Sequence, residues 1–258
     1  MSADDSPIRP EPPGSTPVDP RQGHPRAHTH FVDRAGELVL PAWRRATNGE
    51  ARWPAVLAVL TAMALQFLLP ERLALGRSWI TPAVEGSLLI GLMVISPGRI
   101  TRHIPRVRVV SLLLIAALTI DNITSAGRLI RGVINGTEST DPAKLLLTGG
   151  AIWLANVIVF TLWYWEFDRG GPGERATASH QFPDFVFPQM QSPNLAEADW
   201  EPSFVDYLYM SFTNATAFSP TDTLPFSRWA KLTMMTQSAV SLVTVALVIA
   251  RAVNILKI

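Results

Sequence analysis

The side chains best suited to chemistry lie in a hydroxyl-rich turn near the C-terminus. Five residues there carry an oxygen that could contact a cation or water: Thr216, Ser219, Thr221, Asp222 and Thr223. Hydroxyl and carboxylate oxygens can replace part of an ion's hydration shell, and rings of acidic side chains select cations in pores. The elements on either side of this turn decide how it is held.

A short helix is predicted directly before the turn, over residues 204–215. Ser203 and Asp206 fit the Ser-x-x-Asp pattern of a helix start, in which the hydroxyl caps one backbone donor and the carboxylate reaches back to another. At about 12 residues this helix is roughly 18 Å long, too short to cross a bilayer. Its free backbone groups need protein or water around them, so such a half-helix is tolerated where it lines a cavity. An apolar helix over residues 232–256, long enough to cross, follows the turn.

The stretch from Tyr207 to Lys231 resembles the pore helix, filter and inner-helix start of tetrameric potassium channels. The resemblance covers about fifty residues, from Asp206 to the C-terminal helix. When Asp222 is aligned with the acid that follows the filter, Thr216 takes the innermost hydroxyl position. The resemblance implies a homo-oligomer, a tetramer by analogy, in which a monovalent cation passes along the turn. The chain also resembles bacterial multi-spanning membrane proteins of unknown function, and that resemblance implies no activity.

The turn departs from a potassium filter where that filter has glycines. Ser219, Pro220 and Thr221 stand at the filter's Gly-Tyr-Gly, and Phe218 stands at its valine. Filter glycines adopt positive φ so that successive carbonyls face the axis, whereas serine and threonine are strained there and proline fixes φ near −65°. A carbonyl ladder of the potassium type is therefore not expected. The alternative is a looser filter lined by hydroxyls, with Asp222 as an acidic ring.

Polar residues also follow one face of the last helix. They recur at spacings of four, four and three: Thr233, Gln237, Ser241 and Thr244. Between helices in lipid, such residues hold neighbouring helices together at least as often as they line water. The sequence leaves both interpretations open, packing contacts or the lining of a pore.

Two acids lie inside apolar segments, Glu85 in the second segment and Asp121 in the third. A carboxylate at membrane depth is costly, so it must be protonated, paired or hydrated. Arg128, two helical turns beyond Asp121, could pair with it through water. One interpretation is a proton relay between the two acids; the other is that both lie near helix ends and meet water or basic loops.

Composition indicates a membrane protein of the all-α class. The chain has 258 residues, of which 48% are hydrophobic, and its mean hydropathy is +0.20. Several long windows carry few or no charges, which is typical of spanning helices. The formal net charge of +1 argues against a nucleic-acid partner. Cysteine is absent, which excludes disulfides and thiolate chemistry.

The chain divides into four predicted regions. Residues 1–36 form a proline-rich, disordered tail; residues 37–166 hold an interfacial segment and four crossings; residues 167–202 form a connector; residues 203–258 form the pore-like module. The five predicted crossings run over residues 54–69, 79–95, 107–126, 145–165 and 232–256. Because disordered linkers rarely carry as many aromatic residues as this connector does, we expect it to be folded.

Arginine placement predicts the orientation of the helices. The most basic loop follows the second crossing, and a second basic group precedes the first crossing, which puts the N-terminus in the cytoplasm. With five crossings, the half-helix then enters from the cytoplasm. The pore loop of potassium channels enters from outside, so the charge pattern and the resemblance disagree about sidedness.

The sequence favours a multi-pass protein of the cell membrane that is a candidate cation channel with a non-standard filter. Two alternatives stay open: a non-conducting membrane scaffold or sensor, and a proton-coupled carrier that uses Glu85 and Asp121. No Ser-His-Asp, Cys-His, His-Glu-x-x-His or phosphate-loop pattern occurs, so no enzyme activity and no catalytic residue are predicted. No cofactor or metal site is expected either.

Overall fold

The computed structural model describes residues 40–75, 79–138, 140–180, 182–216 and 222–256. Contacts divide the chain into residues 1–39 and a second unit, Leu40–Ile258, to which all described residues belong. The predicted disordered tail, residues 1–36, lies outside the described residues. The elements of the second unit are η1 (Ala42–Arg44), β1 (Glu50–Ala51), α2 (Trp53–Gln66), α3 (Ile80–Ile95), β2 (Arg99–Ile100), α4 (Pro105–Ile134), α5 (Pro142–Phe167), η2 (Asp168–Gly170), α6 (Pro172–Ala176), β3 (Phe185–Val186), α7 (Pro188–Gln191), α8 (Phe204–Thr216), β4 (Leu224–Pro225) and α9 (Arg228–Leu256).

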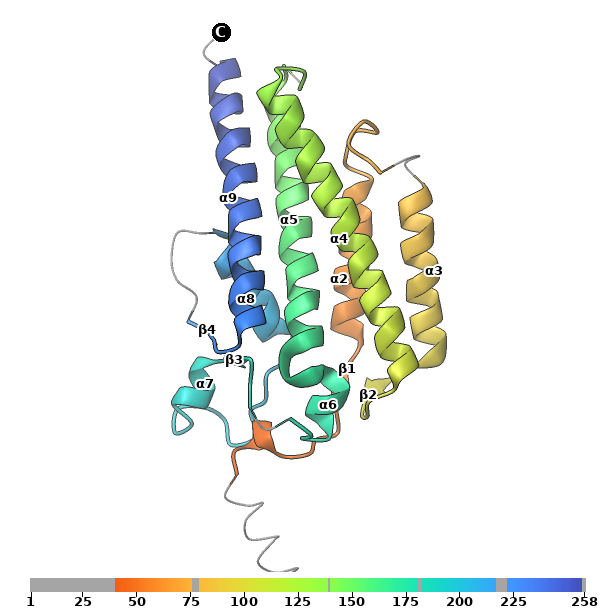
Figure 1. The fold of residues 1–258 in the computed structure, drawn as a ribbon, viewed down its shortest axis with the longest axis vertical. Helices are drawn as coiled ribbons and strands as arrows, with labels where there is room; N and C mark the ends of the chain where they lie inside the picture. The colour runs from red at the N-terminus through yellow and green to blue at the C-terminus, as the bar shows by residue number, and fades with distance from the viewer. Residues whose placement is uncertain (1–39, 76–78, 139, 181, 217–221, 257–258) are drawn as a thin grey trace, which may run out of the picture. The chain divides into compact units, whose positions relative to one another are not determined.

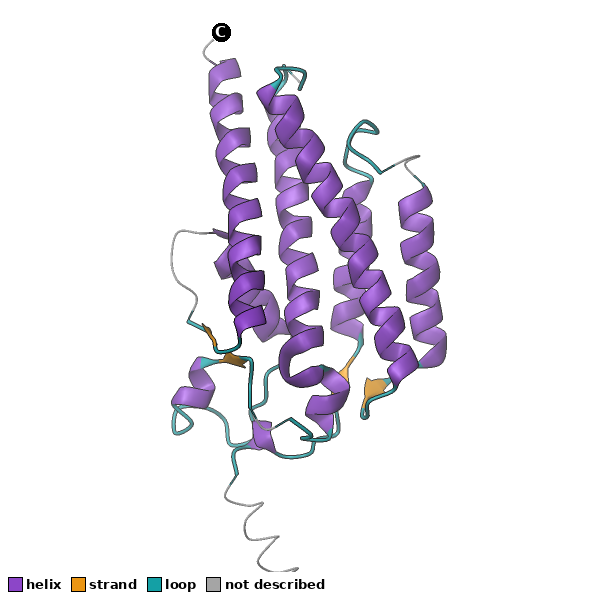
Figure 2. Cartoon of the chain, viewed as in Figure 1, coloured by secondary structure: helices purple, strands orange, loops and turns teal. Residues whose placement is uncertain are grey.

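The described unit is mostly helical, which confirms the all-α prediction (Figure 2). Three of its helices are long and apolar enough to cross a membrane: α4, α5 with its continuation to Gly170, and α9. The other two apolar helices are shorter, with 14 residues in α2 and 16 in α3. They are roughly 21 and 24 Å long, against a hydrocarbon core of about 30 Å. Crossings by α2 and α3 therefore stay a prediction.

The first residues of several helices explain why these helices begin where they do. Proline occupies the first turn of α2, α4 and α5, where its missing N–H costs no hydrogen bond. Asp141 caps α5, since its carboxylate accepts from the N–H groups of Ala143 and Lys144 at 3.0 and 3.4 Å. At α8, Asp206 accepts from the backbone N–H of Ser203, as the sequence predicts. The Ser203 hydroxyl, however, also donates to Asp206 at 2.7 Å.

α5 is the central helix of the unit. It packs against α2, α4, α8 and α9, while α3 packs on the outer side of α4 (Figure 1). In the apolar 18-residue stretch of α5, 67% of the residues are buried, whereas only 22% are buried in the corresponding stretch of α9. α9 therefore lies at an edge of the described unit with most of its surface free.

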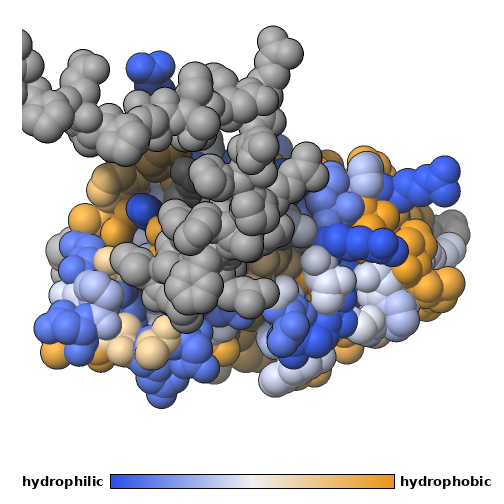
Figure 3. All heavy atoms as spheres, turned by 90° about the horizontal axis from the view of Figure 1, so that it is seen from below, coloured by the Kyte–Doolittle hydropathy of each residue, from blue (hydrophilic) through white to orange (hydrophobic). Residues whose placement is uncertain are grey.

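Short elements form a layer at one end of the long helices, which we call the end cap: η1, β1, β2, η2, α6, β3, α7 and β4 (Figure 1). β1 pairs antiparallel with β2, and β3 pairs antiparallel with β4. Figure 3 looks onto this end, where hydrophilic side chains are grouped beside apolar ones. Within the connector, Phe185 and Phe187 are buried, whereas Phe182 is 83% exposed.

The β3–β4 pair fixes both ends of the segment that contains α8. β3 precedes α8 and β4 follows it, and Phe185 lies opposite Pro225 in the ladder. The backbone N–H of Phe226 also donates to the carbonyl of Asp184 at 2.8 Å. The chain therefore leaves the end cap, forms the 13 residues of α8, and returns to the same end cap.

Candidate functional site

The C-terminal end of α8, which we call its inner end, is held by a buried hydrogen-bond cluster centred on Gln237 of α9. The Gln237 amide nitrogen donates to the carbonyl and hydroxyl of Ser211 at 3.0 and 2.7 Å. Its amide oxygen accepts from Tyr164 and from Asn214, both at 2.7 Å. Gln237, Ser211 and Tyr164 are all fully buried. One side chain of α9 thus joins α5, α8 and α9.

The last carbonyls of α8 also find partners within the chain. Ser238 donates to the Asn214 carbonyl at 3.1 Å, and Ser241 donates to the Ala215 carbonyl. Trp153 of α5 donates to Ser241 at 2.8 Å and lies 3.4 Å from the same Ala215 oxygen. A helix leaves its final carbonyls unpaired, and these side chains satisfy two of them without water.

These hydrogen bonds show which elements the polar face of α9 contacts. Gln237, Ser241 and Thr244 are buried, and Thr244 donates to its own helix at Val240. Thr233 is half-buried and donates to the Trp229 carbonyl at 2.8 Å. The face therefore points toward α5 and α8, which supports the packing interpretation of these four residues. The free face of α9 carries other residues: Leu232, Met235, Thr236, Leu242 and Val243.

The hydroxyl-rich turn is described only at its two ends. Thr216 ends α8, and its hydroxyl donates to the Thr213 carbonyl at 2.7 Å. On the far side, Asp222 is exposed and Thr223 is buried. The predicted site residues Ser219 and Thr221 lie outside the described residues. The filter-like geometry of the turn therefore stays a prediction.

A second buried network, in the end cap, holds the N-terminal end of α8, which we call its outer end. Asp168 directly follows α5 and has no exposed surface. Its carboxylate accepts from the Tyr207 hydroxyl at 2.7 Å and from the N–H groups of Asp184 and Phe185 at 3.0 and 3.3 Å. Three hydrogen bonds offset the cost of burying this acid. They join the end of α5, strand β3 and the first turn of α8.

Asp184 extends this network to the start of α9. Its carboxylate accepts from the backbone N–H of Arg169 at 3.0 Å and from the Trp229 indole at 2.8 Å. Arg169 has a left-handed backbone, with φ of 53°, and Gly171 follows with φ of 99°. A Cβ atom on Gly171 would lie 2.7 Å from the Glu166 carbonyl oxygen, so glycine is required for this turn.

Arg175 is the buried cation of the end cap network that pairs with Glu50. Its guanidinium donates to Glu50 at 2.8 Å and to the carbonyls of Trp165 and Asp168, both at 2.8 Å. The guanidinium also lies over the Tyr207 ring, 5.2 Å from its centre. Burial disfavours the charged form of Arg175, but the negative charges around it, Glu50 foremost and Asp168 among them, together with the hydrogen bond to Glu50, raise its pKa above the ordinary value. Arg175 therefore stays charged and holds β1 to the end of α5.

The two acids of the apolar helices both lie near Gln66 of α2. Glu85 of α3 is fully buried and accepts from the side chain of Gln66 at 2.8 Å. Asp121 of α4 is 5% exposed. A small cavity between α2, α4 and α5 is lined by Gln66, Asp121, Asn122 and Ser125 among apolar residues. Arg128 donates to the Ala74 carbonyl, outside this cavity.

The glutamate has one free oxygen. Oε1 of Glu85 and Oε1 of Gln66 are buried without a hydrogen-bond partner among the described atoms. A proton on Glu85 would give the pair the donor that it lacks. The sequence identifies both acids but not Gln66, because a glutamine at the end of an apolar helix carries no distinctive pattern.

In the part of the chain that the structure describes, no three His, Cys, Asp or Glu side chains are grouped closely enough to hold a metal ion. Many of the buried polar groups belong to the three clusters described above, around Gln237, Asp168 and Glu85. The first two position α8 at its inner and outer ends, and the third lies between α2, α3 and α4. Comparison of the chain with protein-family models, with curated proteins and with solved structures gives no match.

Proposed function

We propose that the protein is a multi-pass membrane protein whose C-terminal part, α5, α8, the following turn and α9, forms a cation-conducting module. The observation that carries this proposal is the return of the chain to the end cap after the 13 residues of α8. If the end cap lies at one membrane surface, α8 is a re-entrant half-helix. A half-helix of this kind, followed by a polar turn and a long apolar helix, is the order of elements in a channel pore.

In this proposal the conducting path lies between copies of the chain. The polar face of α9 is occupied by α8 and α5, so Gln237, Ser241 and Thr244 are not available to line a path within a single chain. The free face of α9 is apolar apart from residues such as Thr236, whose hydroxyl donates to Leu232 of its own helix. Assembly of several copies, four by the resemblance, would bring the turns and the exposed Asp222 side chains around one axis.

Ion flux through the purified protein tests this proposal. We expect single-channel steps in planar bilayers under monovalent cation gradients, and a several-fold lower cation conductance in Asp222→Asn, because a ring of acids concentrates cations at the entrance. Asp199→Asn is the matched control, since Asp199 is an exposed acid of the connector before α8. A flat trace from intact oligomers under every gradient would leave the non-conducting scaffold instead.

Proton-coupled transport is the second candidate function, favoured by the contact between Glu85 and Gln66. An acid that is fully buried with one oxygen unpaired gains a hydrogen-bond donor when it takes up a proton. Glu85→Gln is expected to abolish pH-driven uptake into liposomes while preserving the fold, because an amide also supplies a donor. Glu71→Gln serves as the control, as Glu71 is exposed in the loop after α2. Unchanged pH dependence in Glu85→Gln would rule this function out.

A further inference from the structure

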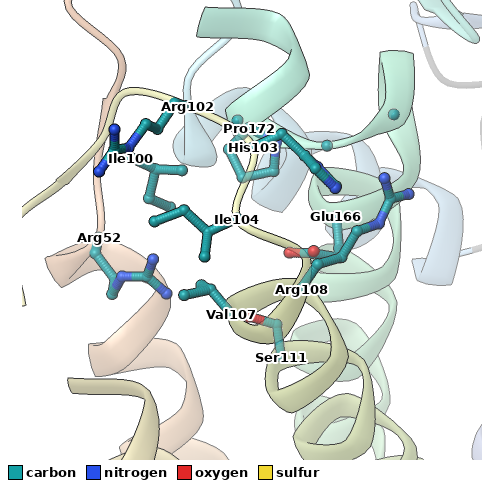
Figure 4. Close-up of a pocket in the computed structure, with 13 residues that line it drawn as sticks. Arg52, Ile100, Arg102, His103, Ile104, Val107, Arg108, Ser111, Glu166 and Pro172 are labelled. Atoms are coloured by element: carbon teal, nitrogen blue, oxygen red, sulfur yellow. The ribbon is translucent and has the colours of Figure 1, made fainter. Parts of the chain in front are cut away.

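A cavity of about 510 Å³ lies in the end cap, where its walls come from η1, β3, α7 and the residues beside β3 and β4. Its volume is within the range of about 300–1,000 Å³ that is usual for ligand sites. The cavity shown in Figure 4, at the starts of α2 and α4 and the end of α5, holds only about 30 Å³, the share of one water molecule. Of these two cavities, only the one in the end cap has room for an organic ligand.

Most of the lining of the end cap cavity is apolar, and part of it is aromatic. Trp43 belongs to η1, Phe182 precedes β3, and Phe226 follows β4. Phe182 and Phe226 are 83% and 63% exposed, so both rings keep most of their surface free for a ligand. Val186 and Met190 add to the apolar lining. An aromatic ring in this cavity could pack against these side chains edge to face or offset.

Arg44 is the cation of this lining, and its hydrogen-bond donors are free. The side chain is exposed, and its guanidinium lies over the Trp43 ring, 4.6 Å from the ring centre. Among the described residues, none accepts a hydrogen bond from this guanidinium, and no carboxylate lies within 4.0 Å of it. The planar guanidinium can therefore donate two parallel hydrogen bonds to a carboxylate that enters the cavity.

Asp184 is the acid of the same lining, and both of its oxygens already have donors. One oxygen accepts from the backbone N–H of Arg169 at 3.0 Å, and the other accepts from the Trp229 indole at 2.8 Å. The Trp43 ring already has two guanidinium groups near it, those of Arg44 and Arg169, which disfavours a cationic ligand over that ring. Charge therefore favours an anion over a cation as the polar part of a ligand.

We propose that the end cap cavity binds a small organic anion with an aromatic body, whose carboxylate pairs with Arg44 and whose ring packs against Phe182 and Phe226. Such a ligand contacts the chain both before and after the α8 segment, because Phe182 precedes β3 and Phe226 follows β4. The lining includes neither the hydroxyl-rich turn nor the polar face of α9. The proposal therefore does not depend on conduction.

Calorimetric titration of the full-length protein in phosphatidylcholine nanodiscs with 2-naphthoate tests the proposal, and empty nanodiscs give the background heat. We expect saturable binding of 2-naphthoate, about tenfold weaker binding of the neutral 2-naphthamide, and no binding of acetate, which has the charge without the ring. Arg44→Gln should weaken 2-naphthoate binding about tenfold and leave 2-naphthamide binding unchanged, because only the anion needs the guanidinium charge. Arg106→Gln, at an exposed arginine of α4 that does not line the cavity, should bind both compounds like the natural chain.

Phe182→Ala is a second variant that tests the aromatic wall. Because this ring is mostly exposed, its removal should leave the fold intact. The variant should weaken the binding of 2-naphthoate and 2-naphthamide by a similar factor, since the charge is retained. Equal affinity of the natural chain for the two compounds would overturn the assignment of an anion. No heat above that of empty nanodiscs, or 2-naphthoate binding that is unchanged in Arg44→Gln and Phe182→Ala, would overturn the site itself.

Discussion

Replacing Arg175 with methionine is expected to lower the free energy of unfolding by about 3–5 kcal/mol, because the change leaves a buried acid without its cation. The guanidinium side chain is 5% exposed and contacts Glu50 and the carbonyls of Trp165 and Asp168. Methionine fills similar space but donates no hydrogen bond. Unfolding in detergent, followed by tryptophan fluorescence against denaturant, measures the loss.

Two companion variants separate charge from hydrogen bonding at this position. Arg175→Lys retains the positive charge but cannot reach Glu50 and both carbonyls together, so it should fall between the natural protein and Arg175→Met. Arg228→Met, at an exposed arginine at the start of α9, should change the unfolding free energy by less than about 0.5 kcal/mol. If Arg175→Met unfolds at the same denaturant concentration as Arg228→Met, the end cap network does not stabilise the fold.

Gln237→Leu is expected to give the second-largest loss, about 2 kcal/mol. Leucine removes the partner of the Tyr164 hydroxyl and of the Asn214 amide, and it removes the donor to the carbonyl and hydroxyl of Ser211. Because these bonds hold the inner end of α8, the variant should also expose the turn after α8 to protease. Thermal unfolding together with limited proteolysis would detect both effects.

Thr236 provides the control for this prediction. Thr236 is adjacent to Gln237 in the sequence but lies on the free face of α9, and its hydroxyl donates to the Leu232 carbonyl of its own helix at 2.9 Å. Thr236→Val should therefore leave stability within about 0.5 kcal/mol of the natural chain. Equal losses in the two variants would show that the cluster around Gln237 does not hold α8.

The helices of this fold follow from local sequence, whereas their contacts do not. Apolar windows locate α2, α3, α5 and α9 and the start of α4 to within about four residues, whereas α4 continues to Ile134, beyond the predicted end at residue 126. Ser203 with Asp206 locates the start of α8. The spacing of Gln237, Ser241 and Thr244 predicts one face of a helix. The spacing does not predict which surface this face contacts, because such residues can lie against lipid, protein or water. In the structure, the face contacts α5 and α8.

The end cap network shows why part of the candidate site escapes sequence reasoning. More than a hundred residues separate Glu50 from Asp168, and irregular structure separates Asp168 from Asp184. In the sequence, each of these acids is simply a polar residue outside an apolar segment. Arg175 joins Glu50 to the Asp168 carbonyl, and the Asp168 carboxylate accepts from the N–H of Asp184. Glu85 and Gln66 meet in the same way, through the packing of α2 against α3.

In the proposed arrangement α8 enters and leaves the membrane at one surface, which can be tested by thiol labelling. Because the chain contains no cysteine, a single introduced cysteine is the only thiol. Three exposed positions report on the claim: Asp199 before α8, Phe226 after the turn, and Lys144 at the start of α5. A membrane-impermeant maleimide should label Asp199→Cys and Phe226→Cys from the same side of the membrane and Lys144→Cys from the other. Labelling of Asp199→Cys and Phe226→Cys from opposite sides would contradict the re-entrant half-helix and, with it, the proposed conducting module.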